Sequence, residues 1–466
     1  MKISFHGAAR TVTGSKHIIT LNNGRSILLD CGLFQGMGKE TMPLNSEWGF
    51  EPAHIDEMVL SHAHIDHCGL IPKLVKDGYK GRIWCTSATA DLARILMRDS
   101  ARIQEGDVKY INKHRVQDNR ELIEPLYTEE DAIAAAEHFC LLEYGDTKEI
   151  LEGVSVILTD AGHLLGSAAV NLTITENGKT TKLTFSGDVG RYRDAILRSP
   201  AVFQADDYVV MESTYGDKLH KPIPPNDTEL LDWINKTCLE QKGKLVIPSF
   251  SVGRTQELLY QLNRFELAGK LPDLQYFVDS PLSIEATEVI KAHPECFNAE
   301  VEMVMRKDPD VFKFKGLTYT RTVEESMRIN DVVGPCVIIS SSGMAEAGRV
   351  KHHIVHNIGD PNSTILLVGY CEPRSLGGQL KAGNKQVKIF GKPFDVVASV
   401  GSIDSMSAHG DYEDLLHWLS CQSTTDLKKV FLVHGDYDVQ QTFAQKILAA
   451  GYKSVEIPAQ HSVWDL

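Results

Sequence analysis

Three histidines and an aspartate fall within six consecutive residues of this chain. The stretch SHAHIDHCG, residues 61–69, contains His62, His64, Asp66 and His67. In an extended segment His62 and His64 share one side, whereas Asp66 and His67 follow where the chain turns toward the next helix. Four such donors crowd a single ion, so the spacing indicates two divalent metals about 3.5 to 4 Å apart, with a carboxylate between them. Catalysis would also need an open position for water.

The remaining donors must come from elsewhere, and the ends of short apolar runs supply them. Six β-rich runs end abruptly in polar residues, at 25–32, 57–64, 155–163, 182–190, 208–216 and 429–436. Each run is typical of a buried strand. Because sites in α/β proteins form at the carboxyl ends of strands, we expect these ends to meet at one site. They offer His163, Asp188 and His434, although a lone histidine at a strand end is more often structural.

The elements that must position these donors follow two patterns. A helical stretch at 87–115 and a second at 128–139, begun by a capping box of Thr128 and Asp131, indicate helices that cover a sheet. From about residue 208 to 395 strands and helices alternate regularly, as in a parallel sheet with crossover helices. We therefore expect a second α/β domain inserted into the first. The expected segments are 1–207, 208–395 and 396–466.

The composition is that of a soluble globular protein with two or three domains. The 466 residues are 42% hydrophobic and 24% charged. The formal charge of -14 argues against nonspecific coating of nucleic acid, but not against a nuclease, because metals offset charge locally and a basic strip can lie on an acidic body. Arg94, Arg98 and Arg102, four residues apart on the first helix, could pack against a sheet or line a substrate groove.

Cysteine usage and hydropathy indicate a cytoplasmic protein. The nine cysteines are scattered singly without a C-x-x-C pair, which fits neither a disulfide framework nor a thiolate zinc site. Most are expected to be small buried hydrophobes, and only Cys31 and Cys68 directly follow candidate site residues. The start of the chain lacks the apolar core of a secretory signal, and no run of about 18 apolar residues could span a bilayer.

The metal-capable residues also carry a family resemblance. The HAHIDH stretch, the later GH at His163, the GD at Asp188 and the strand-end Asp30 resemble the signature of the metallo-β-lactamase superfamily, an αββα sandwich. Three further stretches, MESTYG, SAHGD and LVHGD, resemble the motifs of its β-CASP branch, whose nucleases process nucleic acids. The branch includes the mRNA 3′-end cleavage endonuclease and bacterial ribonucleases. The match runs from residue 3 to about 436 and explains the inserted domain.

The resemblance implies two zinc ions with a shared carboxylate. It assigns the first ion to His62, His64, His163 and Asp188. It assigns the second ion to Asp66, His67, His434 and the shared Asp188. Asp30 would orient a ligand histidine, as carboxylates around metal-bound imidazole do, unless it only forms a turn. Zinc suits this set of imidazoles and carboxylates, and manganese stays open as an alternative.

Hydrolysis of a phosphodiester also needs help for the leaving group. Two metals lower the pKa of a bound water from about 15.7 to about 7, which supplies the nucleophile. The departing 3′ oxygen needs a general acid. The resemblance places a non-ligand histidine at His409, paired with Glu212, whose carboxylate favours the protonated imidazole. We therefore expect Glu212, His409 and Asp66 to be catalytic; as alternatives His409 would cap a helix and Glu212 would be structural.

Substrate phosphates are expected to meet a second group of residues. The stretch SSSGMAEAGRVKHH, residues 340–353, has small residues at a strand end before a helix, an arrangement whose N–H groups bind anions. Such turns are common, and the family's use of this region for phosphates is what singles out particular residues. The expected contacts are Ser341, Ser342, Gly343, Arg349 and Arg254. Arg254 could equally be an ordinary surface arginine, and His352 and His353 are ambiguous between contact and packing.

The leading hypothesis is a dinuclear zinc ribonuclease that cleaves single-stranded RNA between the two domains, leaving 5′-phosphate and 3′-hydroxyl ends. In the branch, a histidine at the position of His434 goes with RNA-processing members, and a DNA-processing nuclease is the alternative. Small-substrate hydrolases lack the insert and the MESTYG and SAHGD motifs. Catalytically silent RNA-binding homologues lose metal ligands that are present here. The sequence leaves three questions open: whether the enzyme is an endonuclease or a 5′ exonuclease, which RNAs it cleaves, and whether it forms a homo-oligomer.

Overall fold

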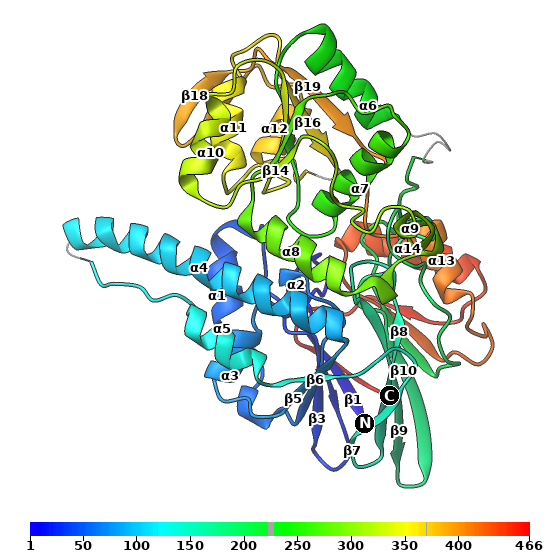
Figure 1. The fold of residues 1–466 in the computed structure, drawn as a ribbon. Coiled ribbons are helices and arrows are strands. Elements are labelled where there is room, and N and C mark those ends of the chain that lie inside the picture. The colour runs from blue at the N-terminus through cyan, green and yellow to red at the C-terminus, as the bar shows by residue number, and fades with distance from the viewer. Residues whose placement is uncertain (119, 222–227, 370) are drawn as a thin grey trace. The chain divides into compact units, whose positions relative to one another are not determined.

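The computed structural model describes residues 1–118, 120–221, 228–369 and 371–466. The chain separates into two units (Figure 1). The first comprises Met1–Leu219 together with His409–Leu466, and the second comprises His220–Ala408. The second unit is thus inserted into the sequence of the first, and both are mixed α/β.

Two seven-stranded sheets form the first unit, and each is half antiparallel and half parallel. The order in one sheet is β22 (Ser462–Asp465), β1 (Lys2–Gly7), β2 (Lys16–Thr20), β3 (Ser26–Leu29), β4 (Glu57–Val59), β5 (Arg82–Cys85) and β6 (Phe139–Leu141). The order in the other is β21 (Val455–Glu456), β20 (Lys429–Leu432), β11 (Tyr208–Met211), β10 (Lys179–Phe185), β9 (Ala168–Glu176), β8 (Val154–Asp160) and β7 (Thr147–Leu151). In the first sheet β3, β4, β5 and β6 are parallel neighbours. In the second sheet β10, β11, β20 and β21 are parallel neighbours.

Alternation along the strands builds two separate cores. On β11, Tyr208 and Val210 face a core shared with the other sheet, whereas Val209 and Met211 face helices on the outside. This is the period of two that a strand imposes on its side chains. Strand β11 is buried along its whole length, because both of its faces are covered.

Helices cover the outer faces of both sheets, which confirms the expected αββα sandwich. The outer core of the second sheet includes residues of α13 (Tyr412–Leu419) and α14 (Tyr437–Ala449). Beside the first sheet, α4 (Ser87–Gln117) packs on β6 and on α5 (Glu129–Ala136), which also contacts α3 (Ile71–Lys76). The predicted capping box of Thr128 and Asp131 begins α5. The short helix α2 (Ile65–Cys68) contacts α4, and α1 (Thr41–Ser46) precedes β4 in the chain.

The second unit contains a six-stranded sheet in which all neighbours are parallel. Its order is β14 (Leu317–Tyr319), β13 (Gln275–Val278), β15 (Cys336–Ser340), β12 (Leu245–Pro248), β16 (Thr364–Val368) and β19 (Ser399–Ile403). Its helices are α6 (Glu229–Ile234), α7 (Arg254–Leu267), α8 (Pro281–Ala292), α9 (Ala299–Met305), α10 (Val323–Asn330), α11 (Val350–Asn357) and α12 (Leu376–Lys381). A hairpin of β17 (Gln386–Ile389) and β18 (Lys392–Asp395) is added.

The second unit begins 12 residues after the expected start at 208 and ends 13 residues after the expected end at 395. Strand β11 belongs to the first unit because it pairs with β20 and β10. Strand β19 belongs to the second because it pairs with β16. Among the described residues, no helix is both long and apolar enough to cross a membrane.

The three arginines on the first half of α4 form ion pairs within the first unit. Arg94 pairs with Asp91 at 2.6 Å, while Arg98 and Arg102 pair with Glu129 at 2.9 and 2.6 Å. These charges are neutralised by neighbouring carboxylates. This observation favours the packing interpretation of the three arginines over the substrate groove.

Candidate metal centre

The loop between β4 and α3 begins with the extended segment that carries His62 and His64, followed by the one-turn helix α2. Three backbone hydrogen bonds hold α2 in place: Ser15 N–H donates to Asp66 O at 2.8 Å, Cys31 N–H to His67 O at 2.7 Å, and Leu33 N–H to Ile65 O at 3.0 Å. Glycine is required at position 32, because a Cβ atom there would lie 1.6 Å from the Asp66 carbonyl oxygen. The metal-capable loop is therefore fixed by its own backbone.

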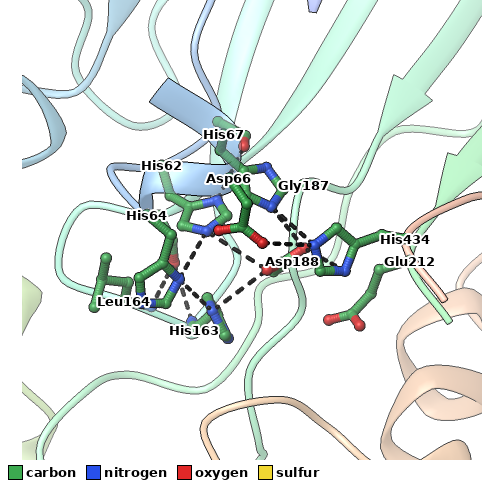
Figure 2. Close-up of polar contacts among 12 residues, drawn as sticks. His62, His64, Asp66, His67, His163, Leu164, Gly187, Asp188, Glu212 and His434 are labelled. Atoms are coloured by element: carbon green, nitrogen blue, oxygen red, sulfur yellow. Dashed lines mark hydrogen bonds and ion pairs between the residues drawn. The ribbon is translucent and has the colours of Figure 1, made fainter. Parts of the chain in front are cut away.

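Four donor atoms converge at one end of the cluster (Figure 2). His64 Nδ1 lies 3.1 Å from both His62 Nε2 and His163 Nε2. Asp188 Oδ2 lies 3.5 Å from His62 Nε2 and 3.6 Å from His163 Nε2. His62, His163 and Asp188 are buried, so these donor atoms are shielded from bulk solvent.

A second set of donors meets at the other oxygen of the same aspartate. His67 Nε2 lies 3.2 Å from His434 Nε2 and 3.3 Å from Asp188 Oδ1. Asp66 Oδ2 lies 3.3 Å from His434 Nε2. Asp188 thus presents one oxygen to each set, and the structure brings together all seven residues that the sequence singled out as metal donors.

The spacing of these donors fits divalent ions. Ligands about 2.0 to 2.1 Å from a tetrahedral zinc lie about 3.3 Å from one another. The donor separations of 3.1 to 3.6 Å in the two sets fall around that value. The buried Oδ1 atom of Asp188 has no hydrogen-bond donor among the described residues, and a cation there would satisfy it.

Hydrogen bonds on the far side of the rings fix the orientation of the histidines. Asp30 is fully buried, and its Oδ2 lies 2.6 Å from His67 Nδ1 while Ser61 N–H donates to its Oδ1 at 2.8 Å. With its proton on Nδ1, His67 turns the lone pair of Nε2 toward the cluster. This is the position that we expected for Asp30.

Two hydroxyl groups that the sequence reasoning missed have the same effect. Ser61 Oγ lies 3.1 Å from His62 Nδ1, and Thr214 Oγ1 lies 3.0 Å from His434 Nδ1. Ser61 directly precedes the histidine cluster and Thr214 lies inside the MESTYG stretch. Their places next to the motifs were the available signal, although a hydroxyl there could not be distinguished from an ordinary turn residue.

Burial and charge set the protonation of the cluster. Burial lowers the pKa of His64 to about 4 and holds the pKa values of His62 and His163 well below the usual value. These rings are neutral, which is the form that binds metals. For Asp66, burial would raise the pKa, but His434 and His67 outweigh it and lower the value to about 2.

A further histidine and a glutamate stand beside the bridging aspartate. His409 Nδ1 lies 3.1 Å from Glu212 Oε1 and 3.9 Å from Asp188 Oδ2. Glu212 is fully buried and is held by the N–H groups of Val189, at 2.7 Å, and Thr214, at 3.2 Å. Burial would lower the pKa of His409, but Glu212 outweighs it and raises the value to about 9. The helix that starts after this loop is capped by Asp411 and not by His409.

The two cysteines beside the site are not available as thiolate ligands. Cys31 and Cys68 are fully buried free thiols. Burial raises the pKa of Cys31 to about 12 and that of Cys68 well above its usual value. Both therefore stay protonated, in line with the expectation of small buried hydrophobes.

The five residues expected at substrate phosphates all lie in the second unit. Ser341 Oγ donates to Ser280 Oγ at 2.8 Å, and Ser342 Oγ to Ala347 O at 3.4 Å. Gly343 is packed so closely that a Cβ atom would lie 2.7 Å from the Phe250 ring. Their role toward a substrate stays a prediction.

The two arginines of that group have protein partners. Arg349 Nη1 donates to Asp279 Oδ1 at 2.7 Å and Nη2 to Arg321 O at 2.8 Å. Arg254 is only 7% exposed, and its guanidinium contacts Glu257 and the Met406 carbonyl. Arg254 is therefore not an ordinary surface arginine, which was the alternative to a phosphate contact.

The two ambiguous histidines of the second unit differ in environment. His353 is buried, with Nε2 2.7 Å from Asp279 Oδ2. His352 is exposed and packs its ring 4.7 Å from the Phe390 ring. Packing therefore accounts for His353, and a contact role stays open for His352.

Comparison with known proteins decides the family. Residues 15–237 match the metallo-beta-lactamase superfamily, 255–380 the Beta-Casp domain, and 394–458 a Zn-dependent metallo-hydrolase RNA specificity domain. The chain is 35% identical over 454 residues to "Ribonuclease TTHA0252" of Thermus thermophilus, covering 97% of this chain and 95% of that protein. It belongs to the β-CASP branch of the metallo-β-lactamase superfamily. The resemblance noted in the sequence is confirmed.

Two further relatives of this β-CASP chain come from other organisms. An "RNase J-like protein" of Methanocaldococcus jannaschii is 30% identical over 460 residues, which cover 98% of this chain and 96% of that protein. The "Endoribonuclease YSH1" of Yarrowia lipolytica is 29% identical over 452 residues, which cover 95% of this chain and 51% of that protein. The β-CASP chain is thus related over almost its whole length to proteins named as ribonucleases.

Proposed function

We propose that the protein is a metal-dependent ribonuclease that hydrolyses phosphodiester bonds of single-stranded RNA and leaves 5′-phosphate and 3′-hydroxyl ends. The observation that carries the proposal is the His409–Glu212 pair beside the bridging carboxylate of Asp188. A donor histidine next to two sets of metal donors suits phosphodiester hydrolysis, because bound metals would activate water and the histidine could protonate the leaving group. The RNA specificity domain matched at residues 394–458 supports RNA as the substrate.

The proposed ligands follow the two donor sets. His62, His64, His163 and Asp188 would hold one divalent ion. Asp66, His67 and His434, with the second oxygen of Asp188, would hold the other. Zinc is the ion that best suits this set, and bound ions would supply Lewis acidity and activate water.

His409 is the proposed general acid. Its Nδ1 atom faces Glu212, so the proton that can be transferred is the one on Nε2. Glu212 keeps the ring oriented, because its own oxygens are fixed by the two N–H groups of Val189 and Thr214. The transferred proton would go to the departing 3′ oxygen.

The proposal is tested with RNA and DNA strands of the same sequence and length. Wild-type protein of known metal content should cleave the RNA and leave the DNA largely intact, with new 5′ ends that a phosphate-dependent ligase accepts. Asp188→Asn, which changes only the shared ligand, is the matched inactive control. Cleavage of DNA alone would instead favour the DNA-processing alternative, and binding of RNA without cleavage by a metal-loaded protein would favour a silent homologue.

A further inference from the structure

The last ten residues of helix α4 differ from the rest of the helix in burial and in charge. All buried residues of α4 lie between Ala88 and Ala101. The arginines of the first half are in ion pairs with Asp91 and Glu129. These last ten residues, VKYINKHRVQ at 108–117, follow Glu105 and Asp107 and include three lysine or arginine residues, one histidine and no acidic residue. In a chain of formal charge -14, such a stretch stands out.

Four of these side chains form one exposed face, here called the tip face: Lys109, Tyr110, Lys113 and His114. Residues four apart are neighbours on a helix, so the two lysines lie in one row and the two rings in the adjacent row. The rings of Tyr110 and His114 meet edge-on at 5.0 Å. Tyr110 is 67% exposed, and the other three are exposed as well.

Within the described part of the chain, the two lysines of the tip face have no acidic ion-pair partner. Among the described residues no carboxylate forms an ion pair with either lysine of the tip face, in contrast to the arginines of the first half. The segment that returns from the helix lies against a different face, where Asn112 Nδ2 donates to Ile123 O at 2.8 Å and Ile123 N–H donates to Asn112 Oδ1 at 3.0 Å. The lysines and the aromatic ring are left to the solvent.

We propose that the tip face is a second contact surface for single-stranded RNA, separate from the metal centre. Two lysines in a row attract successive phosphates, and an exposed tyrosine ring offers a base a surface for stacking. A second copy of this chain suits the surface less well, because a symmetric contact through this face would bring four lysines together. The inference rests on the proposed ribonuclease function, which supplies RNA as the ligand.

The path of α4 links the tip face to the metal centre. The helix begins where the Thr86 and Thr89 hydroxyls donate to Gly166 O at 2.7 and 2.8 Å, in the loop that follows His163. From there α4 projects beyond the strands of the first unit (Figure 1). At about 1.5 Å per residue, the tip face lies roughly 35 to 40 Å along the helix from its start. A trinucleotide cannot span that length, whereas a longer strand can.

Binding is measured by fluorescence anisotropy with an oligouridine of about 20 nucleotides, in a His409→Ala background that prevents cleavage. The double variant Lys109→Glu/Lys113→Glu should bind about tenfold more weakly and lower the magnitude of the slope of log affinity against log salt by about 1.4. Tyr110→Ala should weaken binding severalfold without changing the slope, and Tyr110→Phe should bind like the parent. The matched control is Lys148→Glu/Lys179→Glu, which reverses two exposed lysines on the strands of the same unit and should change the affinity little.

The outcomes separate this inference from the proposed function. With His409 restored, the tip variants should cleave a trinucleotide at the wild-type rate and a long RNA more slowly at low concentration. If the protein cleaves RNA but the tip variants weaken RNA binding no more than the control variant does, the tip-face proposal is overturned and the ribonuclease proposal stands. Binding through the tip face without any cleavage would overturn only the ribonuclease. A wild-type dimer that Tyr110→Ala converts to a monomer, with RNA affinity unchanged, would identify the tip face as a self-association surface instead.

Discussion

His409 and Glu212 lie 197 residues apart in the chain, yet His409 Nδ1 is 3.1 Å from Glu212 Oε1. The glutamate is fully buried, whereas the histidine side chain is 20% exposed. The carboxylate is therefore held from the protein side, and the ring is the member of the pair that can meet a substrate.

The His409–Glu212 pair should act as a unit. We expect His409→Ala to lower kcat for RNA cleavage by about 10² to 10⁴, because the leaving group loses its proton donor. Glu212→Gln should cause a loss of similar size, and the double variant should lose little more than either single variant. Single-turnover kinetics with metal content measured in each variant checks this. Losses that multiply in the double variant would show that the two residues act independently.

Asp188 should be required by both metals and Asp66 by one. Asp188 presents an oxygen to each donor set, so Asp188→Asn should reduce bound zinc at both positions. Asp66 belongs to only one donor set, where it lies beside His434, so Asp66→Asn should leave about one ion bound. Elemental analysis after dialysis against a weak chelator counts the ions. Full occupancy in Asp188→Asn would contradict the shared role.

Asp30 should control metal affinity without touching the metal. Its bond to His67 Nδ1 fixes the ring, and loss of such a partner typically weakens metal binding about 10- to 100-fold. We expect Asp30→Asn to bind zinc that much more weakly and Asp30→Glu to recover part of the affinity. Competition with a fluorescent chelator provides the measurement. An Asp30→Asn protein of unchanged affinity would show that the backbone alone positions His67.

Asp206 should make the protein less stable as the pH rises from about 4 to 7. Burial raises the pKa of this carboxyl to about 7, whereas in the unfolded chain it titrates near 4, so the folded state binds more protons in that window. Above pH 7 this carboxyl lowers the free energy of unfolding by about 1 to 4 kcal/mol, and Asp206→Asn should remove that loss of stability. Thermal unfolding at pH 5 and pH 8 tests this.

The neighbouring carboxylate is the control for this prediction. Lys428 outweighs the effect of burial and lowers the pKa of Asp207, with the two side chains 2.8 Å apart. Asp207→Asn should therefore lose a little stability at pH 8 and less near pH 3. If both variants shift the melting temperature in the same direction at pH 8, the assigned protonation of Asp206 is wrong.

Much of the first unit could be predicted from the sequence. The six apolar runs that end in polar residues are strands β3, β4, β8, β10, β11 and β20, and their ends do meet at one cluster. This worked because each of these strands buries at least one face in an apolar core, and the polar residues mark where each run leaves that core. The capping box at Thr128 could also be predicted, because both of its partners lie within four residues of the chain.

Partners that are distant in the chain were harder to predict. Arg349 pairs with Asp279 across 70 residues, and Arg254 reaches the Met406 carbonyl across 152. Nothing in either local sequence distinguishes an arginine that binds a protein carboxylate from one that awaits a phosphate. The unit boundaries were displaced for the same reason, because only pairing with β20 shows that β11 belongs to the first unit.

The most direct test uses internally labelled single-stranded RNA, incubated with metal-analysed wild-type protein and with metal-analysed His409→Ala, with the products separated on a sequencing gel. We predict that the wild type cuts the RNA and that His409→Ala keeps its metal but cuts at least about 100-fold more slowly. If neither protein cuts although both hold metal, the central claim of a metal-dependent ribonuclease with His409 as its acid is contradicted.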